Sequence, residues 1–98
     1  MSFRLEVRDR ASAEFIEGYL WYEQQREGLG EEFHDEVQER FEFLRQHPDG
    51  FAKWRGPYKK INLERFPYLI VFRVVKSTVI IFSVFHNKRD PQRWGRPK

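Results

Sequence analysis

The feature that most constrains the fold of this chain is a pair of long apolar segments, Tyr68 to Val75 and Thr78 to His86. Both are rich in Val, Ile, Phe and Tyr and contain neither Gly nor Pro, a composition typical of central β-strands. Only Lys76 and Ser77 separate them, which predicts an antiparallel hairpin. Because the Asn-Gly or Gly-X sequences usual in such turns are missing, register and loop length stay open.

The alternation of side chains along this hairpin predicts two different faces. If Val75 lies opposite Thr78, one face belongs to the core, and it consists of Tyr68, Ile70, Phe72, Val74, Val79, Ile81, Ser83 and Phe85. The other is an apolar floor that also carries a cation and an imidazole, and it consists of Leu69, Val71, Arg73, Ile80, Phe82, Val84 and His86. A shift of one residue in register would exchange the two sets.

The first half of the chain predicts one strand and two helices. Phe3 to Arg8 alternates apolar and charged residues, as a strand with one buried side does. The helix that follows is capped by Asp9 or Ser12 and ends at Gly28-Leu29-Gly30, and its core stripe is expected to be Ala13, Ile16 and Leu20, widened by Phe15, Tyr19 and Tyr22. A second helix, roughly Glu31 to Gln46, places on one face Phe33, Val37, Phe41 and Leu44.

The remaining segments complete the predicted architecture. Residues 51 to 57 read as a loop, and a strand is expected near Tyr58 to Leu63, before a break at Phe66-Pro67. The order is then strand, helix, helix, strand, strand, strand. We therefore predict a single α+β domain over residues 1–98, with a βααβββ order in which the N-terminal strand and a helical hairpin pack on an antiparallel sheet.

The charge of the chain is strongly polarised along its length. Residues 1–50 hold 6 basic and 13 acidic side chains (net −7), whereas residues 51–98 hold 12 and 2 (net +10). A basic second half is typical of a protein that binds nucleic acid or an acidic partner. The absence of Cys excludes disulfides, thiol nucleophiles and thiolate metal sites, and no apolar run approaches the ~18 residues of a membrane span. These features favour a cytoplasmic protein without a membrane partner.

No strong catalytic motif is present, so candidate chemistry reduces to clusters. The three histidines, at positions 34, 47 and 86, lack metal-ligand spacing, and we expect no metal and no cofactor. His86 could carry a proton while Lys88 and Arg89 stabilise a phosphorane, which would suit metal-independent RNA cleavage, or it could only fix the strand end by a hydrogen bond. Candidate phosphate or target contacts are Lys59, Arg65, Arg73, Lys88, Arg89 and Arg93.

Two helices can cover only one side of the sheet, so the second side is expected to be bare. Its apolar residues, the candidates for partner binding, are Leu69, Val71, Ile80, Phe82 and Val84. An acidic or amphipathic segment that folds on binding would bury this floor and neutralise the cations around it. The alternative is that the loop at 51–57 and the C-terminal turn, with Trp54 and Trp94, fold over that side themselves.

Several short motifs, in order along the chain, resemble the RelE/ParE toxins of bacterial type II toxin–antitoxin and plasmid-stabilisation modules. They are Ala13 and Phe15, Trp21-Tyr22-Glu23, Gly28-Leu29-Gly30 before Phe33, Pro48, Phe66-Pro67-Tyr68-Leu69-Ile70-Val71-Phe72, and His86-Asn87-Lys88-Arg89-Asp90-Pro91 with Trp94 and Arg96. The resemblance implies a toxin held inactive by a cognate antitoxin in a hetero-oligomer, which would contact operator DNA only through the antitoxin.

The resemblance also bears on the target. RelE-like members cleave mRNA on the ribosome, and the Arg that holds the phosphate in their strand is replaced here by the apolar Leu69. Lys59, His86 and the Lys88-Arg89 pair match only part of that nuclease set, while the Phe-Pro-Tyr and Arg-Asp-Pro segments are similar to the ParE branch. The branch implies inhibition of DNA gyrase without catalysis. The alternatives are an mRNA endonuclease, with His86 and Arg89 catalytic, and a non-toxic member that binds only its antitoxin or DNA.

Overall fold

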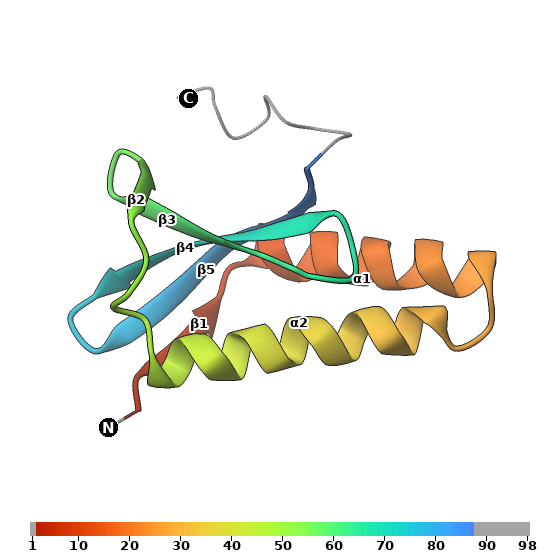
Figure 1. The fold of residues 1–98 in the computed structure, drawn as a ribbon, viewed down its shortest axis with the longest axis horizontal. Coiled ribbons are helices and arrows are strands. Elements are labelled where there is room, and N and C mark those ends of the chain that lie inside the picture. The colour runs from red at the N-terminus through yellow and green to blue at the C-terminus, as the bar shows by residue number, and fades with distance from the viewer. Residues whose placement is uncertain (1, 88–98) are drawn as a thin grey trace.

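A computed structural model describes residues 2–87 of the chain (Figure 1). The elements are β1 (Arg4–Val7), α1 (Asp9–Gln25), α2 (Leu29–Gln46), β2 (Lys53–Arg55), β3 (Tyr58–Asn62), β4 (Tyr68–Val75) and β5 (Thr78–His86). The α+β class and the βααβββ order are confirmed, and both strands of the central hairpin have the predicted bounds. The segment expected to be a loop contains the short additional strand β2.

The five strands form one sheet in the order β1-β5-β4-β3-β2. The pairs within β2-β3-β4-β5 are antiparallel, but β1 runs parallel to β5. The sheet is therefore mixed rather than antiparallel throughout. The helical hairpin connects β1 to β2, which lies at the opposite edge of the sheet. As a result, β1 pairs with the last strand, β5, and not with β2. Both helices cover the same face (Figure 1).

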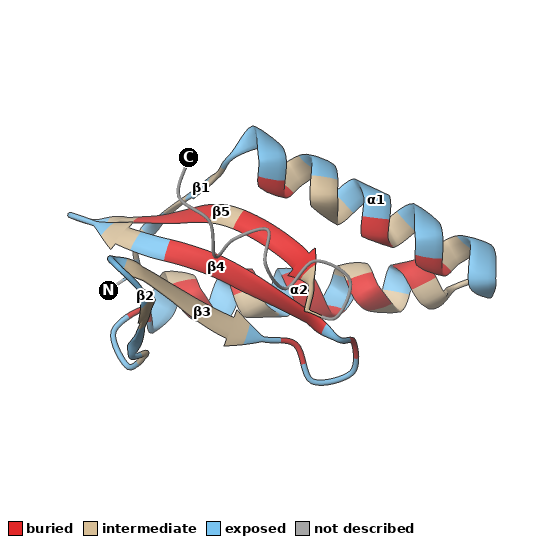
Figure 2. Cartoon of the chain, turned by 90° about the horizontal axis from the view of Figure 1, so that it is seen from above, coloured by how far each residue is buried: buried red, intermediate tan, exposed pale blue. Residues whose placement is uncertain are grey.

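Helix α2 buries the stripe that its sequence predicts, because Phe33, Val37, Phe41 and Leu44 all belong to the main core. For α1 the predicted stripe is only partly correct: Tyr22 is buried and Phe15 and Tyr19 pack against the core, but Ala13, Ile16 and Leu20 do not. This helix buries Ala11, Gly18 and Tyr22, while Ile16 and Leu20 are 59% and 52% exposed and Ala13 is exposed. Figure 2 shows that the outward side of α1 is exposed.

Small residues explain why α1 turns a different side inward. A Cβ on Gly18 would lie 3.0 Å from the Phe33 ring and 3.1 Å from the Tyr68 hydroxyl. The aromatic side chain of α2 thus fits against bare backbone of α1, so close packing decides the orientation of the helix. Because glycine does not count as an apolar residue in a hydrophobicity pattern, the pattern indicated the stripe of Ala13, Ile16 and Leu20 instead.

The central hairpin has the predicted register at its turn, where Val75 lies opposite Thr78 and Lys76 takes the left-handed backbone conformation with φ 55°. The register then shifts between Val71 and Phe72. Phe72 pairs with Ile81, whereas Val71 pairs with Ser83, so Phe82 is the extra residue of a β-bulge.

This bulge corrects the predicted faces of the last part of β5. Val84 belongs to the main core under the helices, and Phe85 belongs to a second cluster with Leu69 and Val71 on the opposite side. By alternation His86 also turns toward the helix side, where its ring lies 5.3 Å from that of the core residue Tyr68. A bulge acts locally as a one-residue slip in register, which a regular alternation cannot reveal.

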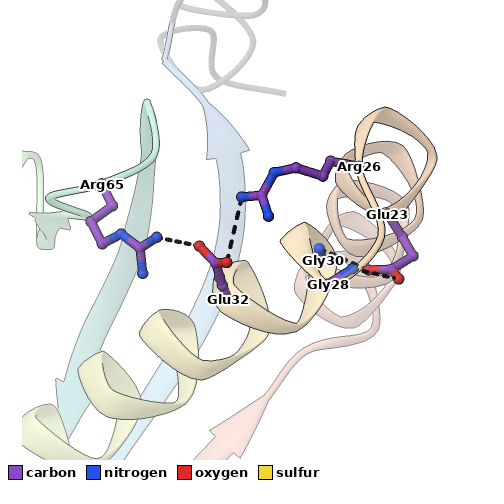
Figure 3. A network of polar contacts seen from close by, with 6 residues as sticks. All are labelled: Glu23, Arg26, Gly28, Gly30, Glu32 and Arg65. Atoms are coloured by element: carbon purple, nitrogen blue, oxygen red, sulfur yellow. Dashed lines mark hydrogen bonds and ion pairs between the residues drawn. The ribbon is translucent and has the colours of Figure 1, made fainter.

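Carboxylates that the sequence did not single out hold the elements together. Glu14 of α1 accepts hydrogen bonds from the Ser83 hydroxyl (2.6 Å) and the Val84 amide (3.0 Å), beyond the end of β1 along β5. Glu23 accepts from the amides of Gly28 and Gly30, both at 2.9 Å (Figure 3). It thereby satisfies N–H groups at the start of α2, where Gly28 has φ 89°.

The helix starts also differ from the prediction. α1 begins directly at Asp9 after Arg8, without a side-chain cap from Asp9 or Ser12, and α2 begins at Leu29 rather than Glu31. Neither helix, as far as the structure describes them, is long and apolar enough to cross a membrane.

Candidate partner-binding face of the sheet

The sheet face opposite the helices is the candidate functional surface, and we call it the open face. Strand alternation and the observed pairing place on it Trp54, Tyr58, Lys60, Leu69, Val71, Arg73, Ile80, Phe82 and Phe85. The main core lies on the other side of the same strands. The open face therefore combines apolar floor residues from β4 and β5 with aromatic and basic residues from β2, β3 and β4.

The apolar floor is better covered than the sequence predicted. Leu69, Val71 and Ile80 are 6%, 0% and 9% exposed, and Trp54, Tyr58 and Phe82 pack against the small cluster of Leu69, Val71 and Phe85. The rings of Tyr58 and Phe82 meet edge to face at 5.2 Å. The expectation of a bare floor is thus wrong, and the alternative in which Trp54 covers part of it is correct. Trp94 lies outside the described residues.

Cations surround these aromatic rings. The Arg55 guanidinium lies 4.5 Å and the Lys60 ammonium 5.6 Å from the centroid of the Trp54 ring, and the Arg8 guanidinium lies 5.3 Å from that of Phe82. Arg73, exposed on β4, adds a further charge. Positive charge interleaved with aromatic surface is suited to an anionic partner. Sequence reasoning missed Arg8 and Arg55, although the run Lys53-Trp54-Arg55 was a visible signal.

The candidate nuclease residues that the structure describes do not meet at one point. Lys59 pairs with Phe72 and lies on the helix side of β3, whereas Arg73 lies on the open face. His86 is two strands from Lys59 and four residue positions further along the sheet, a separation of about 16 Å between backbone positions at the usual strand spacings. Lys88, Arg89 and Arg93 lie outside the described residues.

Arg65 has a structural role instead. Its guanidinium pairs with Glu32 of α2, which also pairs with Arg26 at 3.4 Å (Figure 3). The hydrogen bond from Arg65 holds the pKa of the Glu32 carboxyl below its usual value, and the positive charge of Arg26 acts in the same direction. This network ties the segment before β4 to the helical hairpin, so Arg65 is already engaged within the chain.

Another group of potential ligands lies away from the sheet. Glu31, His34 and Asp35 of α2 bring potential ligand atoms within 4.8 Å of one another. The His34 ring stacks on Phe15 with centroids 5.5 Å apart, and its Nδ1 lies 3.3 Å from an Asp35 oxygen. The carboxylates of Glu31 and Asp35 are exposed. The ring contact with Phe15 and the contact with Asp35 are therefore enough to explain the position of His34 at the surface.

A helical hairpin packed on a five-stranded mixed sheet, with the predicted βααβββ order and the additional short strand β2, matches the fold of the RelE and ParE toxins. A family profile described as the ParE toxin of the type II toxin–antitoxin system parDE matches residues 5–91. The chain therefore belongs to the ParE toxin family, and the family implies a cognate antitoxin as partner.

Solved structures share this fold. One belongs to the chromosomal ParDE toxin–antitoxin system of P. aeruginosa, with a TM-score of 0.76 and 19% identity over 87% of this chain and 96% of that chain. Another is a doubly substituted form of the E. coli toxin RelE in the free state, with a TM-score of 0.67 and 19% identity over 96% of this chain and 93% of that chain. A search of curated proteins gave no match.

Proposed function

We propose that this toxin acts in the cytoplasm by binding and inhibiting DNA gyrase, and that it does not cleave mRNA. Membership of the ParE family supports the target. The observation that carries the choice of mechanism is the separation of the described nuclease candidates, with Arg73 on one face of the sheet and Lys59 and His86 far apart on the other. General acid–base cleavage needs its groups within hydrogen-bond reach of one phosphate.

The proposal predicts that His86→Ala leaves toxicity intact. The purified toxin should convert gyrase and supercoiled plasmid into a cleaved complex, and His86→Ala should do so at the same toxin concentration within about twofold, since the imidazole contributes packing against Tyr68 and no proton transfer. In the same cells, primer extension on ribosome-bound transcripts should show no new ends. Transcript cleavage that His86→Ala abolishes would instead establish the endonuclease, and normal growth on induction would identify a non-toxic member.

We further propose that the antitoxin docks on the open face through an acidic or amphipathic segment. Of the residues expected to bind it, Phe82 is half-buried there, Leu69, Val71 and Ile80 form the floor beneath, and Val84 is excluded because it faces the core. The cations around Trp54 and the exposed Arg73 supply the complementary charge.

Reversing one of these charges tests the docking face. Arg73→Glu should weaken antitoxin binding about tenfold or more, because a like charge would then face the acidic segment. Lys59→Glu makes the same change of charge on the helix side of the neighbouring strand and is the matched control. Isothermal titration with purified antitoxin measures both. Equal losses for the two variants would mean that only net charge matters, and the assignment to the open face would then fail.

A further inference from the structure

The outer surface of α1 carries an apolar ridge that the fold does not use. Ile16 and Leu20 are separated by one helical turn and are 59% and 52% exposed, and Ala13 lies one turn before Ile16 on the same side. A single exposed leucine needs no explanation. Here, however, the exposed stripe has the regular spacing of a buried one, while the opposite side of the helix already supplies the core through Ala11, Gly18 and Tyr22. α1 is thus apolar on two sides.

The surroundings of the ridge are acidic. Glu17 of α1, Glu27 of the turn between the helices, and Glu31 and Asp35 in the first half of α2 are exposed. Glu31 contacts α1 next to the ridge, since it accepts a hydrogen bond at 3.3 Å from the hydroxyl of Tyr19, the residue before Leu20. The negative charge of Glu31 raises the pKa of Tyr19. The nearby Arg10 and Arg26 pair with Glu14 and Glu32 and do not offset these acids.

We propose that this ridge is a second docking surface, which binds an amphipathic helix with a Leu- or Ile-rich face and basic flanks. A helix of that kind would bury Ile16 and Leu20 and place its Lys or Arg side chains against Glu17, Glu31 and Asp35. An acidic segment that suits the open face would be repelled here. A second copy of this chain, joined through its own α1, would bring the same acids of both copies together. The inference is independent of the toxin's target.

The ridge and the open face are on different sides of the molecule. Helix α1 lies beside β5, and its outward side, opposite the buried Ala11, Gly18 and Tyr22, is exposed along its length (Figure 2). A partner on the ridge could therefore bind while an antitoxin segment occupies the open face. The polarised charge of the sequence becomes, in the structure, two surfaces of opposite sign: acidic helices and a basic sheet.

The test uses the full chain and two synthetic helical peptides of about 18 residues with the same leucine face, one flanked by lysines and one by glutamates. In titrations followed by ¹H–¹⁵N NMR, the lysine peptide should shift the amide signals of Ile16 and Leu20, and the glutamate peptide should not. Ile16→Ser with Leu20→Ser should weaken binding of the lysine peptide about tenfold or more. Gln24→Ser with Gln25→Ser, on exposed positions of the same helix, should leave it unchanged.

Charge provides the second readout, in variants that keep the ridge. Glu17→Lys with Asp35→Lys should weaken binding of the lysine peptide, and the loss should shrink as salt is raised, because these pairs are screened in solution. Equal binding of both peptides, binding that survives the serine changes, or no binding would overturn the proposal. Light scattering that shows a dimer abolished by the serine changes would assign the ridge to a second copy and overturn it as well.

Discussion

Replacing Glu36 with alanine should lower the free energy of unfolding by about 3 kcal/mol. This glutamate of α2 is 7% exposed and accepts hydrogen bonds from the amides of Glu64 at 2.6 Å and Arg65 at 3.2 Å. Glu36 also forms an ion pair with Arg40 at 3.6 Å. The Nε atom of Arg40 is buried and has no hydrogen-bond partner. Alanine would leave two backbone donors of the segment before β4 without their acceptor, and the partly buried Arg40 guanidinium would keep only its ion pair with the exposed Glu64.

Urea unfolding of the antitoxin-free protein measures this effect. Glu36→Gln should be intermediate, because its amide offers one acceptor oxygen to two donors and turns an NH₂ group toward the other. Glu39→Ala, an exposed change on the same helix, should stay within about 0.5 kcal/mol. If Glu36→Ala costs no more than Glu39→Ala, the carboxylate does not anchor this segment.

Replacing Gly30 with alanine should destabilise the fold by about 2 kcal/mol. An added Cβ would lie 2.6 Å from the Tyr19 carbonyl oxygen and 2.8 Å from a Glu23 carboxylate oxygen. The carboxylate can move, but the carbonyl belongs to the backbone of α1, so the two helices would have to separate. The overpacking penalty of about 1–3 kcal/mol and the loss of the Glu23 hydrogen bonds outweigh a gain of up to about 1 kcal/mol from the better helix propensity of alanine.

The control for this prediction is Gly50→Ala. A Cβ at Gly50 would meet nothing within 4 Å, so this change should be neutral or slightly stabilising. Thermal and urea unfolding of both variants give the comparison. A neutral Gly30→Ala would show that the helices can separate slightly at this point without cost, and that the close approach of α1 and α2 is not required.

Much of the fold was predictable from sequence because the signals were local. The bounds of β4 and β5, the alternation in β1 and the buried stripe of α2 follow from composition and periodicity over a few residues. By contrast, three features depend on contacts between different segments: the pairing of β1 with β5, the side of α1 that faces inward, and the bulge at Phe82. Periodicity within one segment carries no information on such contacts.

The same division applies to the candidate site. The sequence pointed to a basic, aromatic sheet, and Arg73, Phe82 and the floor residues Leu69 and Val71 do lie on the open face. It could not show that Lys59 and Arg65 lie elsewhere, or that Arg8, Arg55 and Lys60 approach aromatic rings of that face. The face on which a strand residue lies depends on whether its position in the alternation is odd or even. The extra residue in β5 exchanges the two faces beyond the bulge.

By itself, the sequence determined that this chain forms two helices and a hydrophobic hairpin, because the spacing of apolar residues and the residue types set local structure directly. It also determined that the positive charge of the chain lies in its second half. Only the tertiary structure decided which apolar surfaces are buried. Close packing of Phe33 against Gly18 turned Ile16 and Leu20 outward, and the bulge moved Val84 and His86 to the helix side. Which residues a partner can reach depends on how the elements fit together, and that is a property of volume and register rather than of hydrophobicity.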